Sequence, residues 1–429
     1  MVFQLVWILY FVGVAVLPAS SLYAATAVAI VIQLVFALIA TIAALAVWII
    51  SDERSLAPGF RRTAGEHRSL LTATRLSLAL SALGLLALLI DKIIVQGIDY
   101  SGGLAAARAQ WSVLAAEREH VSSIWSALGY LLSSCFFITV TVLTCCRVES
   151  SKTEKAAAWT LCIAFALANS ALTGGRSVLL LLAATLAVLL AVRIDLGQPL
   201  PKIGAPTQLA ATAGIVATGA YTLYIFAERA ELNGIDVHGY AAEMLEFLGA
   251  EPTPVFQRLS GDTWFGRLAA LAALALAYLV HSFFTFAAIV EAPPQEVDLL
   301  FGYVTDLAAK VGLGARPDSE WLLTGRFPSL PGALFIKGGI GLVAFTAACL
   351  GAAMALSVRL SQRFPTSLAV IAVCWAVQTT AVLSPMLAAT ELLNFPFVFA
   401  EFFLVAAAVR LGQTFRHAAS SCASNCRHC

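Results

Sequence analysis

Five arginines lie near the ends of apolar runs, where a charged side chain is costly and therefore suggests a function. They are Arg108, Arg176, Arg229, Arg267 and Arg326. Arginine carries a planar fork of N–H donors that binds phosphate or carboxylate at two points. Each of them alone could equally be an interfacial residue that reaches toward lipid phosphate. Five on one predicted face favour a site for an anion.

Two of these arginines adjoin turns that lead into helix N-termini. Arg176 follows two glycines in ALTGGRS and begins the next apolar run. Arg326 precedes the proline- and glycine-rich sequence FPSLPGALFIKGGIG. A helix N-terminus offers free N–H groups and a partial positive charge, and both favour an anion. We therefore expect both segments to suit an anionic ligand.

His281 lies in the apolar segment YLVHSFFTF and could act as a general base. Neutral imidazole can take a proton from a hydroxyl nucleophile near neutral pH. A lone histidine in an apolar segment can instead be a structural residue whose hydrogen bonds are satisfied. Sequence spacing alone does not separate these two interpretations.

The chain that must position these residues is strongly apolar. Of its 429 residues 12% are charged, whereas a soluble domain carries about 25%. Its apolar runs are about 20 residues long, enough to cross a bilayer, whereas the strands of a membrane β-barrel would be short and alternating. The sequence predicts an all-α polytopic membrane protein with about 10–11 transmembrane helices. The runs lie at about 2–18, 22–50, 72–96, 124–146, 157–173, 177–193, 208–227, 268–290, 333–357, 367–387 and 392–409.

The loops between the runs differ in charge. The short basic loops RRTAGEHR, RVESSKTEK and RLSQR are expected in the cytoplasm by the positive-inside rule. Residues 228–332 hold 13 Asp and Glu but only six Lys and Arg, so we expect them outside. This predicts an N-terminal transmembrane block at 1–227, a large external loop region at 228–332, a C-terminal transmembrane block at 333–410 and a cytoplasmic Cys/His-containing tail at 411–429.

The apolar run at 268–290 allows two topologies. If it crosses the membrane, RLSQR and the tail fall outside, against the charge rule. If it is a re-entrant or interfacial helix pair, ten spans keep every short basic loop inside. The segment also carries or adjoins Arg267, Tyr278, His281 and Glu291, which fit poorly with a lipid-facing span. We favour the re-entrant or interfacial arrangement, and an ordinary span is the alternative.

Several other kinds of site are not indicated. The sequence has no Walker A, HExxH, Rossmann or G-x-S-x-G motif, and its net charge of +1 gives no bulk attraction to nucleic acid. Cys422, Cys426 and Cys429, with His417 and His428, could bind zinc. No second cluster completes a fold around them, so we expect no metal and no cofactor.

Together these features resemble the Wzy-type oligosaccharide repeat-unit polymerases, also called O-antigen polymerases. The resemblance is carried by DYSGGLAAARAQW leading into SSIWSALGYLL, by LTGGRS, by YLVHSFFTF and by FPSLPGALFIKGGIGLV. It spans most of the chain, with a large periplasmic loop late in the sequence. It implies a GT-C-like fold and a multi-pass protein of the bacterial inner (plasma) membrane.

The resemblance implies a glycosyltransferase that polymerises undecaprenyl-pyrophosphate-linked repeat units at the periplasmic face, for the O-antigen of lipopolysaccharide or a related surface polysaccharide. Its partners would be these lipid-linked glycans, membrane lipids and a chain-length regulator, but no nucleic acid. Within that family, Arg108 and Arg176 would contact pyrophosphate and His281 would be the base. The residues it assigns are, for catalysis, His281 and Arg176, and, for substrate binding, Arg108, Arg267, Arg326, Tyr278, Glu291 and Arg229.

Two other functions also fit the sequence. An O-antigen ligase transfers finished glycan to the lipid A core and resembles the polymerases in architecture. A flippase or other transporter of lipid-linked oligosaccharides belongs to a different class. It should line its spans with charges that face a central cavity, whereas charges within the apolar runs are few here.

Overall fold

The computed structural model describes residues 2–51, 64–116, 123–146, 150–173, 177–195, 219–221, 223–259, 263–292, 300–310 and 327–425. Helices make up 84% of the structure. Eight of the described helices are long and apolar enough to cross a membrane. The chain is therefore an all-α polytopic membrane protein, as the sequence predicts.

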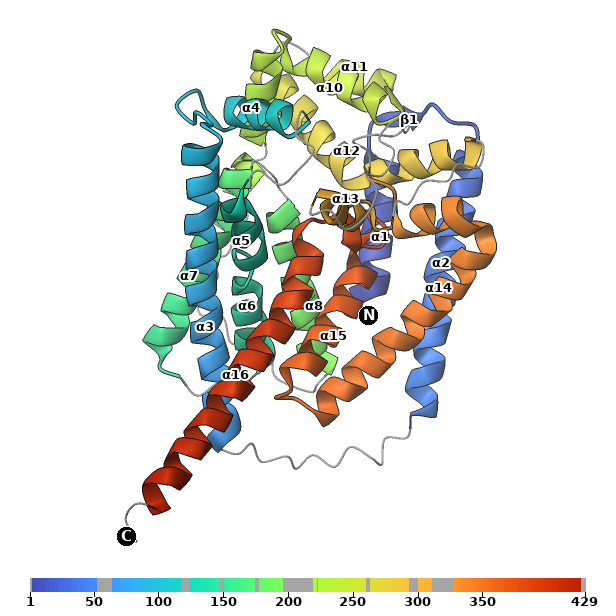
Figure 1. The fold of residues 1–429 in the computed structure, drawn as a ribbon. Coiled ribbons are helices and arrows are strands. Elements are labelled where there is room, and N and C mark those ends of the chain that lie inside the picture. Colours follow the sequence, from blue (N-terminus) through green and yellow to red (C-terminus); the bar gives the residue numbers. More distant parts are fainter. Residues whose placement is uncertain are drawn as a thin grey trace.

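Most of the helices lie side by side in a bundle (Figure 1). They are α1 (Val2–Val16), α2 (Thr26–Ile50), α3 (Ala64–Leu89) with its π-helical continuation η2 (Ile90–Val95), α5 (Ile124–Leu132), α6 (Phe136–Cys145), α7 (Lys152–Thr173), α8 (Ser177–Asp195), α14 (Leu330–Arg363), α15 (Leu368–Leu383) and α16 (Asn394–Asn425). The apolar helices α1 and α15 are shorter than a usual span. Most of the predicted run at 208–227 lies outside the described residues.

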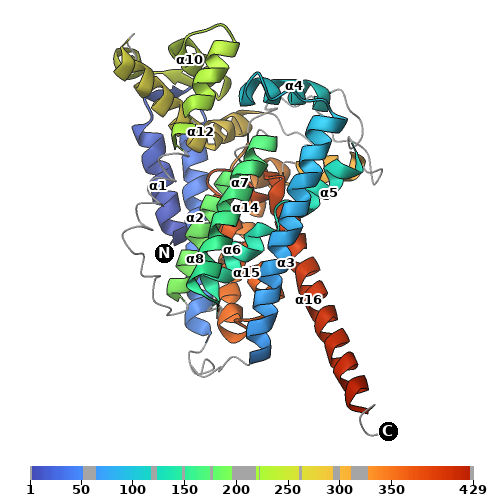
Figure 2. The same ribbon diagram turned by 90° about the vertical axis from the view of Figure 1, so that its left-hand side faces the viewer.

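The remaining elements gather at one end of the bundle, the outer end, which is uppermost in Figures 1 and 2. They are α4 (Leu104–Ala116), α10 (Val237–Phe247), α11 (Pro254–Leu259), α12 (Trp264–Glu291), α13 (Gly302–Lys310) and η3 (Ala389–Glu391), with the antiparallel strands β1 (Ala19–Ser21) and β2 (Ala250–Pro252). The helix ends that flank the short basic loops lie at the opposite end. By the charge rule, we expect this outer end to face away from the cytoplasm.

The expected helix pair at 268–290 is instead the single continuous helix α12. Thr263 begins it, because its hydroxyl accepts a hydrogen bond from the Gly266 N–H at 3.1 Å. Figures 1 and 2 show α12 lying obliquely across the outer end. Residues 280–289 are buried on all sides. Protein contacts therefore account for the apolar character of residues 280–289, although the length and composition of α12 also suit a span.

α14 changes direction sharply at Gly338 and Gly339 (Figure 1). Gly339 has φ +61° and ψ −163°, a combination that is essentially restricted to glycine. The helix begins before these glycines, where the Ser329 hydroxyl accepts from the Gly332 N–H at 3.2 Å. The apolar run predicted at 333–357 is therefore divided, with a short helix before the glycines and a long span after them.

α2 and α14 pack closely because small residues line their contact. Ala347, Gly351 and Ala355 recur every four residues along α14 and are buried. A β-carbon added at Gly351 would collide with the carbonyl group of Ala40 in α2. Small residues at this spacing let helices approach closely in membranes, where packing replaces the hydrophobic effect as the driving force.

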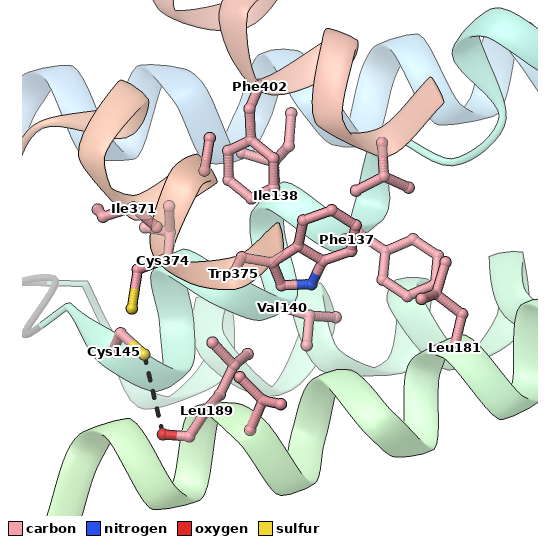
Figure 3. Close-up of a cluster of buried hydrophobic side chains, with 14 of the residues drawn as sticks. Phe137, Ile138, Val140, Cys145, Leu181, Leu189, Ile371, Cys374, Trp375 and Phe402 are labelled. Atoms are coloured by element: carbon pink, nitrogen blue, oxygen red, sulfur yellow. Dashed lines mark hydrogen bonds between the residues drawn. The ribbon is translucent and has the colours of Figure 1, made fainter. Parts of the chain in front are cut away.

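Trp375 of α15 anchors a core among α6, α8 and α16 (Figure 3). Its Nε1–H donates to the Thr185 hydroxyl at 3.0 Å, so the buried indole has its polar group satisfied. Its ring centroid lies 5.1 Å from Phe395 and 5.8 Å from Phe402. Cys145 lies in the same core as a free thiol, as its apolar surroundings in the sequence predicted.

Candidate functional site

Arg108 fixes α4 to the end of α7. Its Nη1 donates to the carbonyl oxygen of Thr173 at 2.6 Å, and its guanidinium lies 4.5 Å from the ring centroid of Trp111. Beside it, the Tyr100 hydroxyl donates to the carbonyl of Leu172 at 3.1 Å. These side chains line a small open cavity at the outer end. A cation at this position also interacts favourably with the helix C-terminus.

Arg176 lies outside the described residues, together with the two glycines before it. α7 ends at Thr173 and α8 begins at Ser177. The segment that carries Arg176 therefore starts at the residue to which Arg108 binds. A shared role for Arg108 and Arg176 stays a prediction, and the chain connectivity is compatible with it.

A second cation in this region was missed by the sequence interpretation. The Lys92 ammonium lies 4.6 Å from the ring centroid of Trp111, the same ring that Arg108 contacts. Lys92 and its neighbour Asp91 are almost fully buried, with 4.0 Å between ammonium and carboxylate. Both belong to η2, and π-helical turns are frequent at functional sites. The Asp–Lys pair inside the apolar run at 72–96 was the signal that could have revealed them.

Two residues in the loop before α4 have shifted pKa values. The N–H and hydroxyl of Ser101 donate to Asp99 at 2.8 and 2.9 Å, which lowers the pKa of that carboxyl group. Burial, and next the negative charge of Asp91, raises the pKa of Tyr100. At neutral pH the loop therefore holds an anionic Asp99 at the surface and a neutral Tyr100 that donates to α7.

His281 is buried, and both of its ring nitrogens have hydrogen-bonding partners. Nδ1 lies 2.7 Å from the carbonyl oxygen of Tyr278, and the Phe327 N–H donates to Nε2 at 3.3 Å. This pattern assigns the proton to Nδ1 of a neutral ring. The lone pair that a general base would use is therefore occupied by Phe327. Arg326, the residue before Phe327, lies outside the described residues, so His281 holds the segment that follows Arg326.

The helix at residues 223–232 links these two groups of side chains. The ring centroid of Phe226 lies 5.7 Å from that of Tyr278. On the same helix, Glu228 approaches Gly103 at the start of α4 so closely that a β-carbon there would collide with the carboxylate. Segments far apart in the sequence therefore converge at the outer end.

The other three predicted residues lie elsewhere along these elements. Arg229 is partly exposed on the linking helix, and Arg267 is exposed near the start of α12. Along α12, Arg267 and His281 are separated by about 21 Å. Glu291 Oε1 accepts the Ala25 N–H at 2.7 Å, where α2 begins. The structure therefore gives Glu291 a helix-capping contact and does not bring it to His281 as the sequence grouping implied.

Metal-ligating side chains are not clustered in the part of the chain that the structure describes. No group of three or more His, Cys, Asp and Glu side chains there is arranged to hold a metal ion. The side chains of the Cys/His tail, where a zinc site was considered, lie outside that part.

Comparison with known proteins found no relative of this chain. No protein-family model, no curated protein and no solved structure matches the chain. The support for any function therefore comes from the residues of this chain alone.

Proposed function

We propose that the protein polymerises undecaprenyl-pyrophosphate-linked oligosaccharide repeat units at the periplasmic face of a bacterial inner membrane. The observation that carries the proposal is the contact of Arg108 with the end of α7 at Thr173, the residue that precedes the sequence GGR. It supports a cluster of Arg108 and Arg176 at the end of a membrane bundle, and Lys92, whose charge is paired with Asp91, contacts the same Trp111 ring as Arg108. Such a cluster suits a pyrophosphate whose lipid remains in the bilayer.

In the proposed reaction, a hydroxyl oxygen of the acceptor sugar attacks the anomeric carbon of the donor glycan. A new C–O bond forms, and the bond from that carbon to the pyrophosphate oxygen breaks. The electron pair leaves with undecaprenyl pyrophosphate, and the hydroxyl proton passes to water at the outer end. Arg108 and Arg176 stabilise the negative charge that develops on the leaving oxygen, an effect worth about 10²–10³ in rate for each well-placed donor.

In this mechanism His281 is a positioning residue. Its Nε2 binds the Phe327 N–H, and it thereby holds the segment that brings Arg326 toward the glycan or phosphate. His281 could serve as the base only after Phe327 moves away. Tyr278, whose carbonyl orients the imidazole, packs its ring against Phe226 of the linking helix.

A reconstituted assay tests this function. The purified protein in lipid nanodiscs is given a synthetic undecaprenyl-pyrophosphate-linked repeat unit, and glycan length and released undecaprenyl pyrophosphate are measured together. A polymerase yields longer lipid-linked glycans and one released lipid pyrophosphate for each bond formed. Transfer only to added lipid A core would identify a ligase instead. If neither product forms, glycosyl transfer is not the activity of the protein.

Transport of lipid-linked oligosaccharides is the second candidate. It is favoured by a carboxylate, Glu401, that is fully buried within a candidate span. In proteoliposomes that contain a labelled lipid-linked glycan, a flippase would make the inner-leaflet pool accessible to an external glycosidase. A polymerase that does not transport would leave that pool protected.

A further inference from the structure

One span of the bundle is interrupted near its middle. Residues Ile124–Cys145 have the length and composition of a single span, yet the helix breaks between α5 and α6. α3 lies directly against this break, because a β-carbon at Gly84 would collide with the Ser133 backbone. Tight turns keep most of the backbone at the break hydrogen-bonded, because the Cys135 N–H donates to the Leu132 carbonyl and the Phe137 N–H donates to the Ser134 carbonyl. The break therefore adds mainly the hydroxyl groups of Ser133 and Ser134 to the interior of the bundle.

Amide side chains from two other helices bind the serines of the break. Asn169 of α7 donates to the Ser133 hydroxyl at 2.8 Å, and Asn394 of α16 donates to the Ser134 hydroxyl at 2.7 Å. All four residues are buried. The Oδ1 atom of Asn169 has no hydrogen-bonding partner among the described residues. The break thus collects hydroxyl and amide groups inside the bundle.

Glu401 lies about 10 Å farther along α16 than Asn394, and its side chain points to the same break. The Ser134 N–H and the Cys135 thiol face its carboxylate. Neither carboxylate oxygen, however, has a hydrogen bond of normal geometry within the described part of the chain, and the side chain is fully buried. The ion pairs seen among the described residues, Arg75–Glu154 and Lys92–Asp91, do not involve it.

The helices that pack against α16 bring few other ionisable groups. They are Arg68 and Arg75 on α3, Tyr130 on α5, Cys145 on α6, Arg193 and Asp195 at the end of α8, Cys374 on α15 and Glu391 in η3, and Glu401 has an ion pair with none of them. Cys135 is the titratable side chain that faces Glu401 directly. Within the described residues, the carboxylate therefore has no protein cation to balance its charge.

A carboxylate this deeply buried needs a compensating positive charge, since its desolvation is not offset by an ion pair. Broken membrane helices with acidic side chains and unpaired oxygens provide the usual chemistry for binding Na⁺ or H⁺. We propose that Glu401 and the α5–α6 break form a binding site for a monovalent cation, either a proton or Na⁺. The site is separate from the Arg108 region and goes beyond the proposed glycosyl transfer.

Thermal unfolding of the detergent-purified protein tests this proposal. Wild type and Glu401→Gln are compared at rising pH, in NaCl and in choline chloride. A proton site predicts that the wild-type Tm falls relative to Glu401→Gln as pH rises, equally in both salts. A sodium site predicts that NaCl raises the Tm of wild type and not that of Glu401→Gln. Parallel Tm curves under all conditions would overturn the proposal.

Two additions keep the test independent of how well the variant folds. Glu154→Gln, which removes an exposed carboxylate paired with Arg75, is the matched control and should follow the wild-type curve. Wild-type protein is also treated with a hydrophobic carbodiimide, which modifies protonated buried carboxyl groups, and Glu401 is followed by peptide mass spectrometry. Modification that falls with rising pH or with added Na⁺ supports the site. Equal modification, or none, under every condition contradicts it.

Discussion

His281 offers a direct way to separate a positioning role from general-base catalysis. In the structure, His281 Nε2 accepts a hydrogen bond from the Phe327 N–H at 3.3 Å, and His281 Nδ1 lies 2.7 Å from the Tyr278 carbonyl oxygen. A Gln side chain can place an acceptor near the Nε2 position, whereas Ala places none. We therefore expect His281→Gln to retain most of the wild-type activity and His281→Ala to lose much more.

The geometry sets the size of these effects. The Phe327 contact is long, so losing its acceptor costs about 1 kcal/mol, the lower end for a desolvated donor. That free energy corresponds to a rate loss of about fivefold if it all falls on the positioning of the segment after Arg326. Removing a general base would instead cost about 10²–10⁴ in rate. His281→Ala also leaves a cavity, so its unfolding free energy falls further.

The assay is the initial rate of undecaprenyl pyrophosphate release in nanodiscs, measured with the thermal stability of each variant. Under the positioning account, His281→Gln keeps most of the wild-type rate and the wild-type pH dependence, whereas His281→Ala loses about fivefold from the lost acceptor. If His281→Gln is as inactive as His281→Ala while both remain folded, His281 is the base. The assignment of its Nε2 to Phe327 would then not describe the active state.

Three further predictions concern packing, ionisation and the second cation. Gly351→Ala should destabilise the protein because its β-carbon meets the Ala40 carbonyl, whereas Gly341→Ala on the same helix has open space and should be neutral in thermal unfolding. The pKa of Asp99 is lower in the folded protein than in the unfolded chain. Its ionised carboxylate therefore stabilises the fold at pH values above the unfolded pKa, and this stabilisation is lost as the pH falls through the folded pKa. The Tm difference between wild type and Asp99→Asn should therefore shrink to zero in acid, and a constant difference would contradict the Ser101 contacts. Lys92→Met should reduce the rate of pyrophosphate release more than Lys92→Arg, and equal rates for the two would remove Lys92 from the site.

The long helices were predictable because each needs a continuous apolar run. The charged loops also predicted which helix ends would share one side of the bundle. α12 was predicted less well, since an apolar run of 28 residues looks the same whether lipid or protein surrounds it. The turn within α14 depends on the unusual backbone angles of Gly339, and a glycine-rich sequence indicates only that such angles are allowed.

The candidate site was predictable only in part. Arg108 was found because a charged residue near a membrane is conspicuous, but its partner, the Thr173 carbonyl, carries no sequence signal. The role of His281 depends on Phe327, 46 residues later, and no local pattern links the two. Glu401 was overlooked because a single acid in an apolar run has meaning only when its neighbours in space are known.

The most direct measurement of the central claim compares two arginines at the outer end of the protein. Arg108→Ala is set against Arg258→Ala, which alters an exposed arginine of α11, in the nanodisc assay of undecaprenyl pyrophosphate release. Arg108→Lys, which keeps the charge but not the planar fork, separates loss of charge from loss of geometry. We predict a loss of about 10²–10³ in rate for Arg108→Ala, a smaller loss for Arg108→Lys and an unchanged rate for Arg258→Ala. Equal rates for Arg108→Ala and Arg258→Ala, with both proteins folded, would contradict a pyrophosphate site at the Arg108 contact with α7.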